Sequence, residues 1–147
     1  MVENSKQLEG LEDKLTGHLS KNCHAAHFHP LKGVIINLAI SACDDMDGEL
    51  RVALEKALEL WKDKACFGER GGNLIERSRK ELDKSIKYAD VDSKEAWLAR
   101  LNYTSLHNMA EDDDTLLTLI FEYSTTNELD AHELSKILID QFPDFNI

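Results

Sequence analysis

Apolar residues recur every three or four positions along almost the whole chain. This spacing places about one side chain per turn on the same face of an α-helix, so it restricts the fold more than any other feature. The clearest stripes are Leu8, Leu11, Leu15 and Leu19, then Leu50, Leu54, Ala57 and Trp61, and finally Leu134, Ile137, Leu138 and Phe142. The Val34-Ile35-Ile36 run favours a strand by propensity, but no other segment offers it a pairing partner. We therefore predict an all-α fold.

Start and stop signals divide the chain into about seven short helices. Their expected positions are residues 5–21, 30–42, 47–65, 73–88, 92–106, 111–123 and 130–142. Three starts carry a capping box, in which a side chain caps the helix and a Glu three positions later reaches back. The pairs are Asn73 with Glu76, Asp92 with Glu95, and Asp130 with Glu133, the last supported by a hydrophobic staple of Leu129 and Leu134.

The length of 147 residues is enough to bury a core without metals or disulfides. The 2 prolines and 7 glycines form no linker, and no repeat or low-complexity tract divides the chain. We predict a single domain over residues 1–147, a helical bundle with Trp61 and Ile120 in its core. The segment around Ile120 is apolar nearly all round, which predicts a central helix.

The charge is strongly acidic, with 28 Asp and Glu against 17 Lys and Arg and a net charge of −11. Such a surface repels phosphate backbones, so direct nucleic-acid binding is disfavoured. It suits a protein partner with a basic surface. The densest acidic cluster is Glu111, Asp112, Asp113 and Asp114, which we expect to open a helix and to face a partner.

The three cysteines, Cys23, Cys43 and Cys66, contain no CxxC pair, which argues against a disulfide framework and for a reducing compartment. The first residues are polar and acidic, without an apolar signal core. The longest apolar stretch, residues 33–42, is too short to cross a bilayer. We therefore expect a cytoplasmic protein that does not enter the membrane. The sequence leaves its oligomeric state open.

Soft metal ligands gather between the first two predicted helices, at Cys23, His24, His27 and His29. Thiolate and imidazole groups suit zinc or another transition metal. A second ligand pair at a familiar spacing is missing. The alternative is a polar joint whose histidines face water or pack singly.

The segment between the last two predicted helices has acidic and hydroxyl residues at alternating positions. The ligand places fall on the side chains of Glu122, Ser124, Thr126, Asp130 and Glu133 and on the carbonyl of Glu128. This stretch resembles an EF-hand loop, with Leu129 at the hydrophobic place. It departs from the pattern at Glu122, where Asp is usual, and at Asn127, where Gly is usual. The resemblance implies a calcium loop, whereas the capping box accounts for Asp130 and Glu133 without an ion.

A glycine-rich turn, Gly68 to Asn73, precedes a predicted helix with a basic face. Such a turn can hold a phosphate at a helix start, but no P-loop signature follows it. No nucleophile motif stands out, because the serines lie within predicted helices and paired carboxylates are common in so acidic a chain.

The sequence therefore favours a binding role over catalysis, although it leaves enzymatic activity open. The leading hypothesis is a small protein-interaction module, such as an inhibitor, an immunity-type protein or an adaptor, with no cofactor. The alternative is a metal-binding protein or metal-dependent enzyme that uses the cluster of Cys23, His24, His27 and His29.

Overall fold

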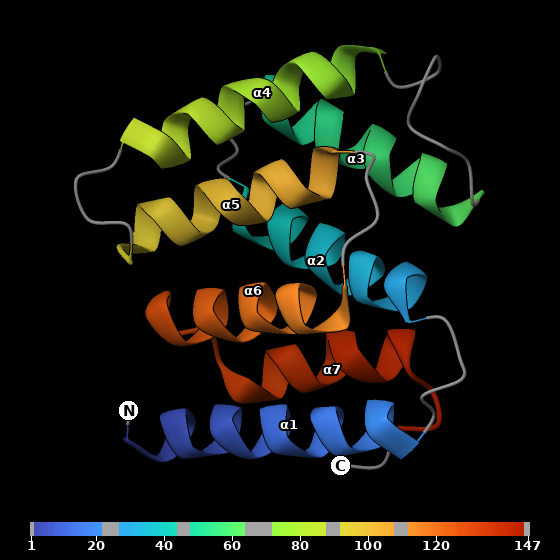
Figure 1. Ribbon diagram of the computed structural model, residues 1–147, viewed down its shortest axis with the longest axis vertical. Helices are drawn as coiled ribbons and strands as arrows, with labels where there is room; N and C mark the ends of the chain where they lie inside the picture. Colours follow the sequence, from blue (N-terminus) through green and yellow to red (C-terminus); the bar gives the residue numbers. More distant parts are fainter. Residues whose placement is uncertain are drawn as a thin grey trace.

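The computed structural model describes residues 2–21, 27–43, 48–63, 72–87, 92–107 and 112–145. These residues form seven helices and no strand, which confirms the predicted all-α bundle (Figure 1). The helices are α1 (Val2–Lys21), α2 (Phe28–Ala42), α3 (Gly48–Lys62), α4 (Gly72–Lys87), α5 (Lys94–Leu106), α6 (Asp113–Thr126) and α7 (Ala131–Gln141).

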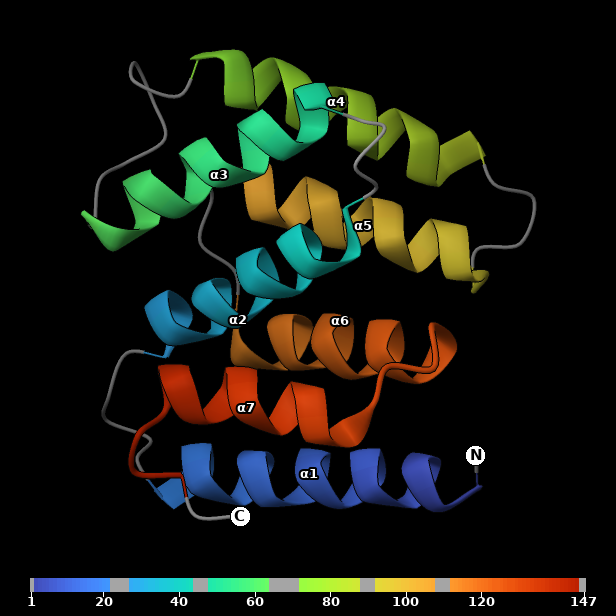
Figure 2. The same cartoon turned by 180° about the vertical axis from the view of Figure 1, so that it is seen from behind.

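The helices stack in two groups on either side of α2 (Figures 1 and 2). At one end α1 packs against α6 and α7, so the first helix of the chain meets the last two. At the other end α4 packs against α5 and α3. We refer to these groups as the α1/α6/α7 end and the α3/α4/α5 end. The two ends meet through α2 and through the contact between α5 and α6.

Helix α2 shares the central position that the sequence predicts for α6. Ile120 of α6 is fully buried, as predicted. α2 contacts α3, α5, α6 and α7, and it buries both apolar and polar residues. Gly33 permits close packing here, because a Cβ on it would collide with the Trp61 ring and lie 2.7 Å from Gln141 Oε1. Trp61 itself is half-buried, so its predicted place in the core is only partly correct.

The predicted cap of α5 is off by one residue. Ser93 takes the N-cap position, and its Oγ accepts a hydrogen bond from the Ala96 N–H at 3.2 Å. Asp92 lies one position outside. Ser and Asp cap helices equally well, so the local pattern could not choose between them. The side chain of Asn73, the predicted cap of α4, lies outside the described residues.

The start of α7 is satisfied by a residue of α1. Asp130 holds the N-cap position, as predicted, but its side chain makes no capping hydrogen bond. Instead, Asn4 Oδ1 accepts from the Ala131 N–H at 2.8 Å, and Asn4 Nδ2 donates to the Leu129 carbonyl at 2.9 Å. The predicted capping box is therefore wrong in its chemistry. The contact joins residues more than 120 positions apart, which no local pattern can show.

Candidate functional site

An open groove of about 560 Å³ lies between α5 and α6, beside the second half of α4. Its lining combines aromatic, apolar, hydroxyl and charged side chains from three helices. These are Leu82 of α4, Trp97, Arg100, Tyr103 and Thr104 of α5, and Asp114, Thr115, Thr118 and Leu119 of α6. The volume falls in the range of about 300–1,000 Å³ that is usual for ligand pockets.

The α5 wall of the groove presents a row of three large side chains. Trp97, Arg100 and Tyr103 follow one another at three-residue spacing, which keeps them on one side of the helix. The Arg100 guanidinium lies 4.4 Å from the centre of the Trp97 ring, a cation–π contact that orients both groups. The Tyr103 ring lies 4.7 Å from that of His107, centre to centre. All three side chains are half-buried, so each keeps a face open to the groove.

The acidic residues at the start of α6, which the sequence predicts to form one cluster, make different contacts. Asp112 caps α6, because its Oδ1 accepts from the Thr115 N–H at 2.8 Å. Hydrogen bonds from the Thr115 main chain and side chain lower the pKa of the Asp112 carboxyl below its ordinary value. Asp113 Oδ2 lies 2.8 Å from Nδ1 of the buried His27. Glu111 lies outside the described residues.

Asp114 is the member of the cluster that lines the groove. It is exposed, and within the part of the chain that the structure describes its carboxylate makes no hydrogen bond or ion pair. The sequence predicts one acidic surface. In the structure, Asp112 and Asp113 make contacts within the fold, whereas Asp114 faces the groove.

The beginning of α2 contacts both the end of α5 and the start of α6. The ammonium group of Lys32, which is 3% exposed, donates to the His107 carbonyl at 2.7 Å and also to the Thr104 carbonyl. A cation at these last carbonyls opposes the negative end of the α5 dipole. His27, the residue before α2, contacts Asp113 at the start of α6. The same helix therefore holds both α5 and α6, which form the two walls of the groove.

The proposed metal ligands are only partly described. Cys23 and His24 lie outside the described residues. His27 contacts Asp113 of α6, while the His29 ring stacks on Trp61 of α3 at 4.5 Å between centres. The two described imidazoles are thus held by different helices. No group of three or more His, Cys, Asp or Glu residues suited to a metal occurs among the described residues.

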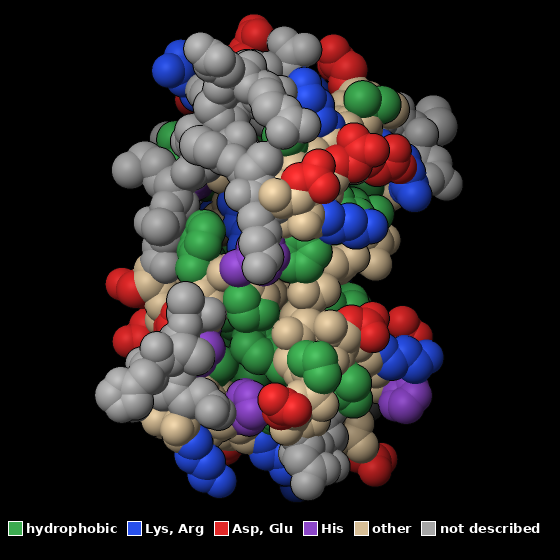
Figure 3. Space-filling model, turned by 90° about the vertical axis from the view of Figure 1, so that its right-hand side faces the viewer, with side chains coloured by type: hydrophobic (Ala, Val, Ile, Leu, Met, Phe, Trp, Pro, Cys, Tyr) green, Lys and Arg blue, Asp and Glu red, His purple; other side chains and the backbone are tan. Residues whose placement is uncertain are grey.

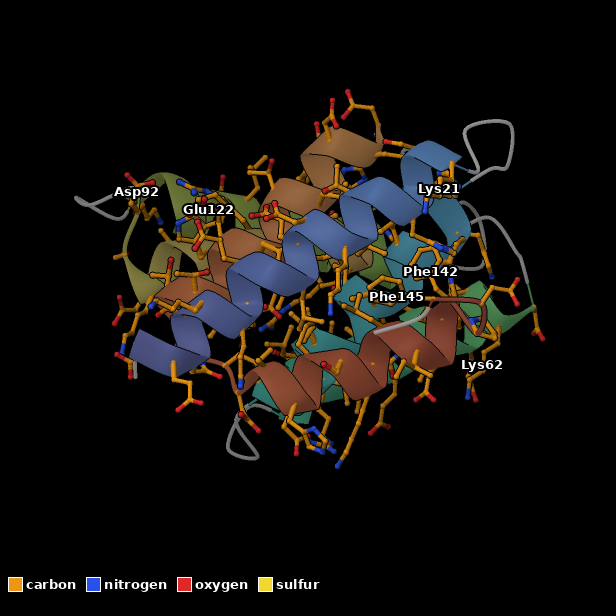
Figure 4. All side chains as sticks on the ribbon, turned by 90° about the horizontal axis from the view of Figure 1, so that it is seen from below. Lys21, Lys62, Asp92, Glu122, Phe142 and Phe145 are labelled. Carbon is orange, nitrogen blue, oxygen red and sulfur yellow. The ribbon has the colours of Figure 1, made fainter. Side chains whose placement is uncertain are left out.

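Other histidine contacts at this side of the molecule are aromatic. The His18 ring of α1 lies 6.1 Å from Phe142 and 5.6 Å from Phe145, which follow α7. Figure 4 shows both phenylalanines between α7 and α1. Figure 3 shows histidine side chains beside an apolar patch on this face. Packing against aromatic rings accounts for these histidines better than a shared ligand set.

The resemblance to an EF-hand loop is not borne out by the backbone. Three of the proposed ligand positions, Glu122, Ser124 and Thr126, lie within α6. Ser124 is buried and donates to the Ile120 carbonyl at 2.7 Å, so its hydroxyl serves the helix. α6 continues through these residues because Leu119, Phe121 and Tyr123 remain buried along it. The ligands therefore cannot converge as they do in a calcium loop.

A short helix-ending turn replaces the expected loop. The Leu129 N–H donates to the Ser124 carbonyl at 2.8 Å, and the Glu128 N–H donates to the Thr125 carbonyl at 3.2 Å. This is the hydrogen-bond pattern of a Schellman motif. Its left-handed residue is Glu128, with φ of 54°, and not Asn127, which has φ of −91°.

The glycine-rich turn before α4 lies largely outside the described residues, so a phosphate site there stays a prediction. One member of the basic helix that follows is engaged within the fold. Arg77 contacts Glu81 of the same helix at 3.2 Å and Glu49 of α3 at 3.4 Å. Glu81 is 1% exposed, so this ion pair lies inside the α3/α4/α5 end.

The groove does not stand out in the sequence, because Trp97 alone fits the apolar pattern of a helix. The spacing of Trp97, Arg100 and Tyr103 was the available signal, since such a row is not a normal apolar stripe. The described residues include no helix with the length and apolarity needed to span a membrane.

Comparison with known families gives no match to this chain, and neither a curated protein nor a solved structure matches it.

Proposed function

We propose that this chain is a protein-interaction module and that the α5–α6 groove is its binding surface. The observation that carries the proposal is the half-buried row of Trp97, Arg100 and Tyr103 on α5. Trp, Tyr and Arg dominate binding energy in protein interfaces, because they cover a large area and combine apolar faces with polar tips. An inhibitor, an immunity-type protein or an adaptor would fit this class.

The chemistry of the groove supports binding over catalysis. Its nine lining residues include neither an imidazole nor a thiol, and the one carboxylate among them, Asp114, makes no hydrogen bond with the Thr104, Thr115 or Thr118 hydroxyl. The nearby imidazole of His27 is held by Asp113. Asp114 and Arg100 supply charge of both signs, which suits recognition of a polar rim around an apolar centre.

The charge of the whole chain supports a basic partner. The net charge of −11 attracts a positive surface over a distance set by the Debye length, about 8 Å at physiological salt. Asp112, Asp113 and Asp114 add negative charge at one end of the groove. We expect association to slow as salt rises, because such steering acts mainly on the association rate.

Affinity capture from the source cell, followed by mass spectrometry, tests the proposal. We expect wild type to retain a stoichiometric partner that Trp97→Ala loses. The matched control is Ile139→Ala on α7, a helix that contributes no residue to the groove, and this change removes an apolar side chain that is 44% exposed. A partner retained equally by wild type and Trp97→Ala would place the binding surface elsewhere.

Metal binding remains the second candidate, and one observation favours it. A carboxylate on one imidazole nitrogen, as Asp113 provides for His27, is the usual arrangement behind a metal-ligating histidine. Cys23 and His24 would have to supply further ligands. Elemental analysis of protein purified without a histidine tag tests this candidate: a stoichiometric transition metal that His27→Ala removes would support it, and metal-free protein would reject it.

A further inference from the structure

We infer that the partner presents an amphipathic helix to the α5–α6 groove, with a Lys or Arg beside its apolar stripe that pairs with Asp114. This inference rests on the proposed function and names the partner element that the same site accepts. The helical walls of the groove, its length and the position of its charges support it.

The walls select the form of the partner. Both long walls are helices whose main-chain groups are bonded within the helix, and the described residues contain no strand. An extended peptide that binds by adding a strand needs a sheet edge, which these walls do not provide. A helix satisfies its own main-chain hydrogen bonds and needs only a surface for one face. The α5–α6 groove therefore suits a helix laid along it.

The length of the groove matches two turns of helix. Trp97 and Tyr103 are six positions apart on α5, which is about 9 Å at 1.5 Å per residue. A partner helix that places apolar side chains at i, i+4 and i+7 covers about 10 Å. Leu82 and Leu119 give the groove the apolar lining that such side chains need.

The charges give the groove a direction. α5 and α6 run antiparallel (Figure 1), and the Asn127 side chain at the end of α6 donates to the Lys94 carbonyl at the start of α5 at 3.4 Å. Asp114, at the opposite end of α6, therefore lies towards the Tyr103 end of the groove. Its exposed carboxylate favours a basic side chain at that end.

The experiment uses two display libraries of 14-residue peptides selected on the full-length chain. The first library fixes Leu at i, i+4 and i+7 on a helix-forming background and randomises the flanking positions. The second contains prolines that prevent a helix. We expect binders from the first library, with Lys or Arg enriched on one flank, and we expect Trp97→Ala to weaken them at least tenfold.

The matched variant reverses one charge. With Asp114→Lys as target, we expect the selected basic flank to be replaced by Glu or Asp, and the Kd of a binder selected on wild type to rise about fivefold. Circular dichroism of Asp114→Lys checks that the helical fold is kept. Ile139→Ala should change neither selection.

The outcomes separate this inference from the proposed function. Binders that depend on Trp97 but come from the proline library, or that ignore the charge at position 114, would overturn the inference and keep the groove as a binding surface. If neither library gave binders that Trp97→Ala weakens, the groove itself, and with it the proposed function, would be rejected.

Discussion

The α1/α6/α7 end and the α3/α4/α5 end of this molecule both bury leucines, such as Leu54 and Leu101 at the second end, but among the described residues the second end also buries more polar side chains. At the first, leucines form the interior, as shown by Leu8, Leu15 and Leu134, which are at most 2% exposed. At the second, the described buried residues of α4 are Ser78 and Glu81, and α5 buries Asn102, with its Oδ1 unpaired among the described residues, and Ser105.

Because of this difference, we expect substitutions at the two ends to destabilise the fold for different physical reasons. Truncating a buried apolar side chain lowers the free energy of unfolding because it leaves a cavity. A buried polar group stabilises the fold only when its hydrogen-bond or charge partner is present. The binding groove lies where the two ends meet, with one wall from each. Single substitutions at the two ends test this difference in buried contacts.

Ile120→Ala should have the largest effect. Ile120 is fully buried in α6, so its loss removes apolar contact and leaves a cavity. We expect the free energy of unfolding to fall by about 3–4 kcal/mol, measured by denaturant titration. Val52→Ala, at a position 66% exposed on α3, is the control and should change it by less than about 0.5 kcal/mol. Equal losses of stability in Ile120→Ala and Val52→Ala would show that the burial of Ile120 contributes nothing to stability.

Glu81→Ala should destabilise the α3/α4/α5 end through charge. Glu81 and Arg77 form an ion pair in which their side chains are 2% and 13% exposed. Removing one partner leaves the other charge poorly compensated, which costs about 3 kcal/mol. The double variant Arg77→Met with Glu81→Leu should cost less than Glu81→Ala alone, because it removes both charges. A double variant that loses as much stability as Glu81→Ala alone, or more, in thermal unfolding would contradict a coupled pair.

Asn4→Ala should destabilise the protein more than Asp130→Ala. The first change leaves the Ala131 N–H and the Leu129 carbonyl without their side-chain partner, at a cost of about 1–2 kcal/mol. The second removes a side chain that makes no capping bond, and we expect less than about 0.5 kcal/mol. The reverse order in chemical denaturation would restore the capping box that the sequence predicts.

Glu128→Gly should stabilise the α1/α6/α7 end. Glu128 has φ of 54°, where a side chain is unfavourable and glycine is not. Relief of this strain should outweigh the extra freedom of glycine in the unfolded chain, giving a gain of about 0.5 kcal/mol. Asn127→Gly, with φ of −91°, serves as the control and should lose stability. A loss in both variants would show that the turn carries no strain.

Glu12→Gln should produce a small gain that depends on pH. Burial and the nearby Glu122 carboxylate raise the pKa of Glu12. A raised pKa means that the folded state loses stability as pH rises through the carboxyl range. At neutral pH the substitution should therefore add a few tenths of a kcal/mol, since Glu12 is only half-buried and solvent screens its charge. At a pH below that range the variant and wild type should unfold together.

The sequence predicted the features that depend on neighbouring residues. The leucine stripe of α1 and the burial of Ile120 follow from spacing alone, and both are present. The clamp of Asn4 on α7 could not be predicted, because its partners lie at the far end of the chain. The groove needed the antiparallel placement of α5 beside α6, which α2 enforces through Lys32 and His27.

The structure also changes which acidic residues should be substituted to test partner binding. The sequence suggests that Asp112→Asn with Asp113→Asn would leave the fold unaffected. Asp112 caps α6, a role that Asn can also fill, and Asp113 contacts His27, so both side chains serve the fold and are poor probes of partner binding. Asp114→Asn is the informative substitution, because it changes charge at the groove and breaks no contact among the described residues.

The most direct test of the account is the Kd of the captured partner, measured by titration calorimetry against Trp97→Ala and Ile139→Ala. Both variants remove a partly exposed apolar side chain, one in the groove and one on α7. We predict that Trp97→Ala raises the Kd at least tenfold, about 1.4 kcal/mol or more, and that Ile139→Ala leaves it unchanged. An unchanged Kd in Trp97→Ala, or a larger rise in Ile139→Ala, would contradict the assignment of binding to the α5–α6 groove.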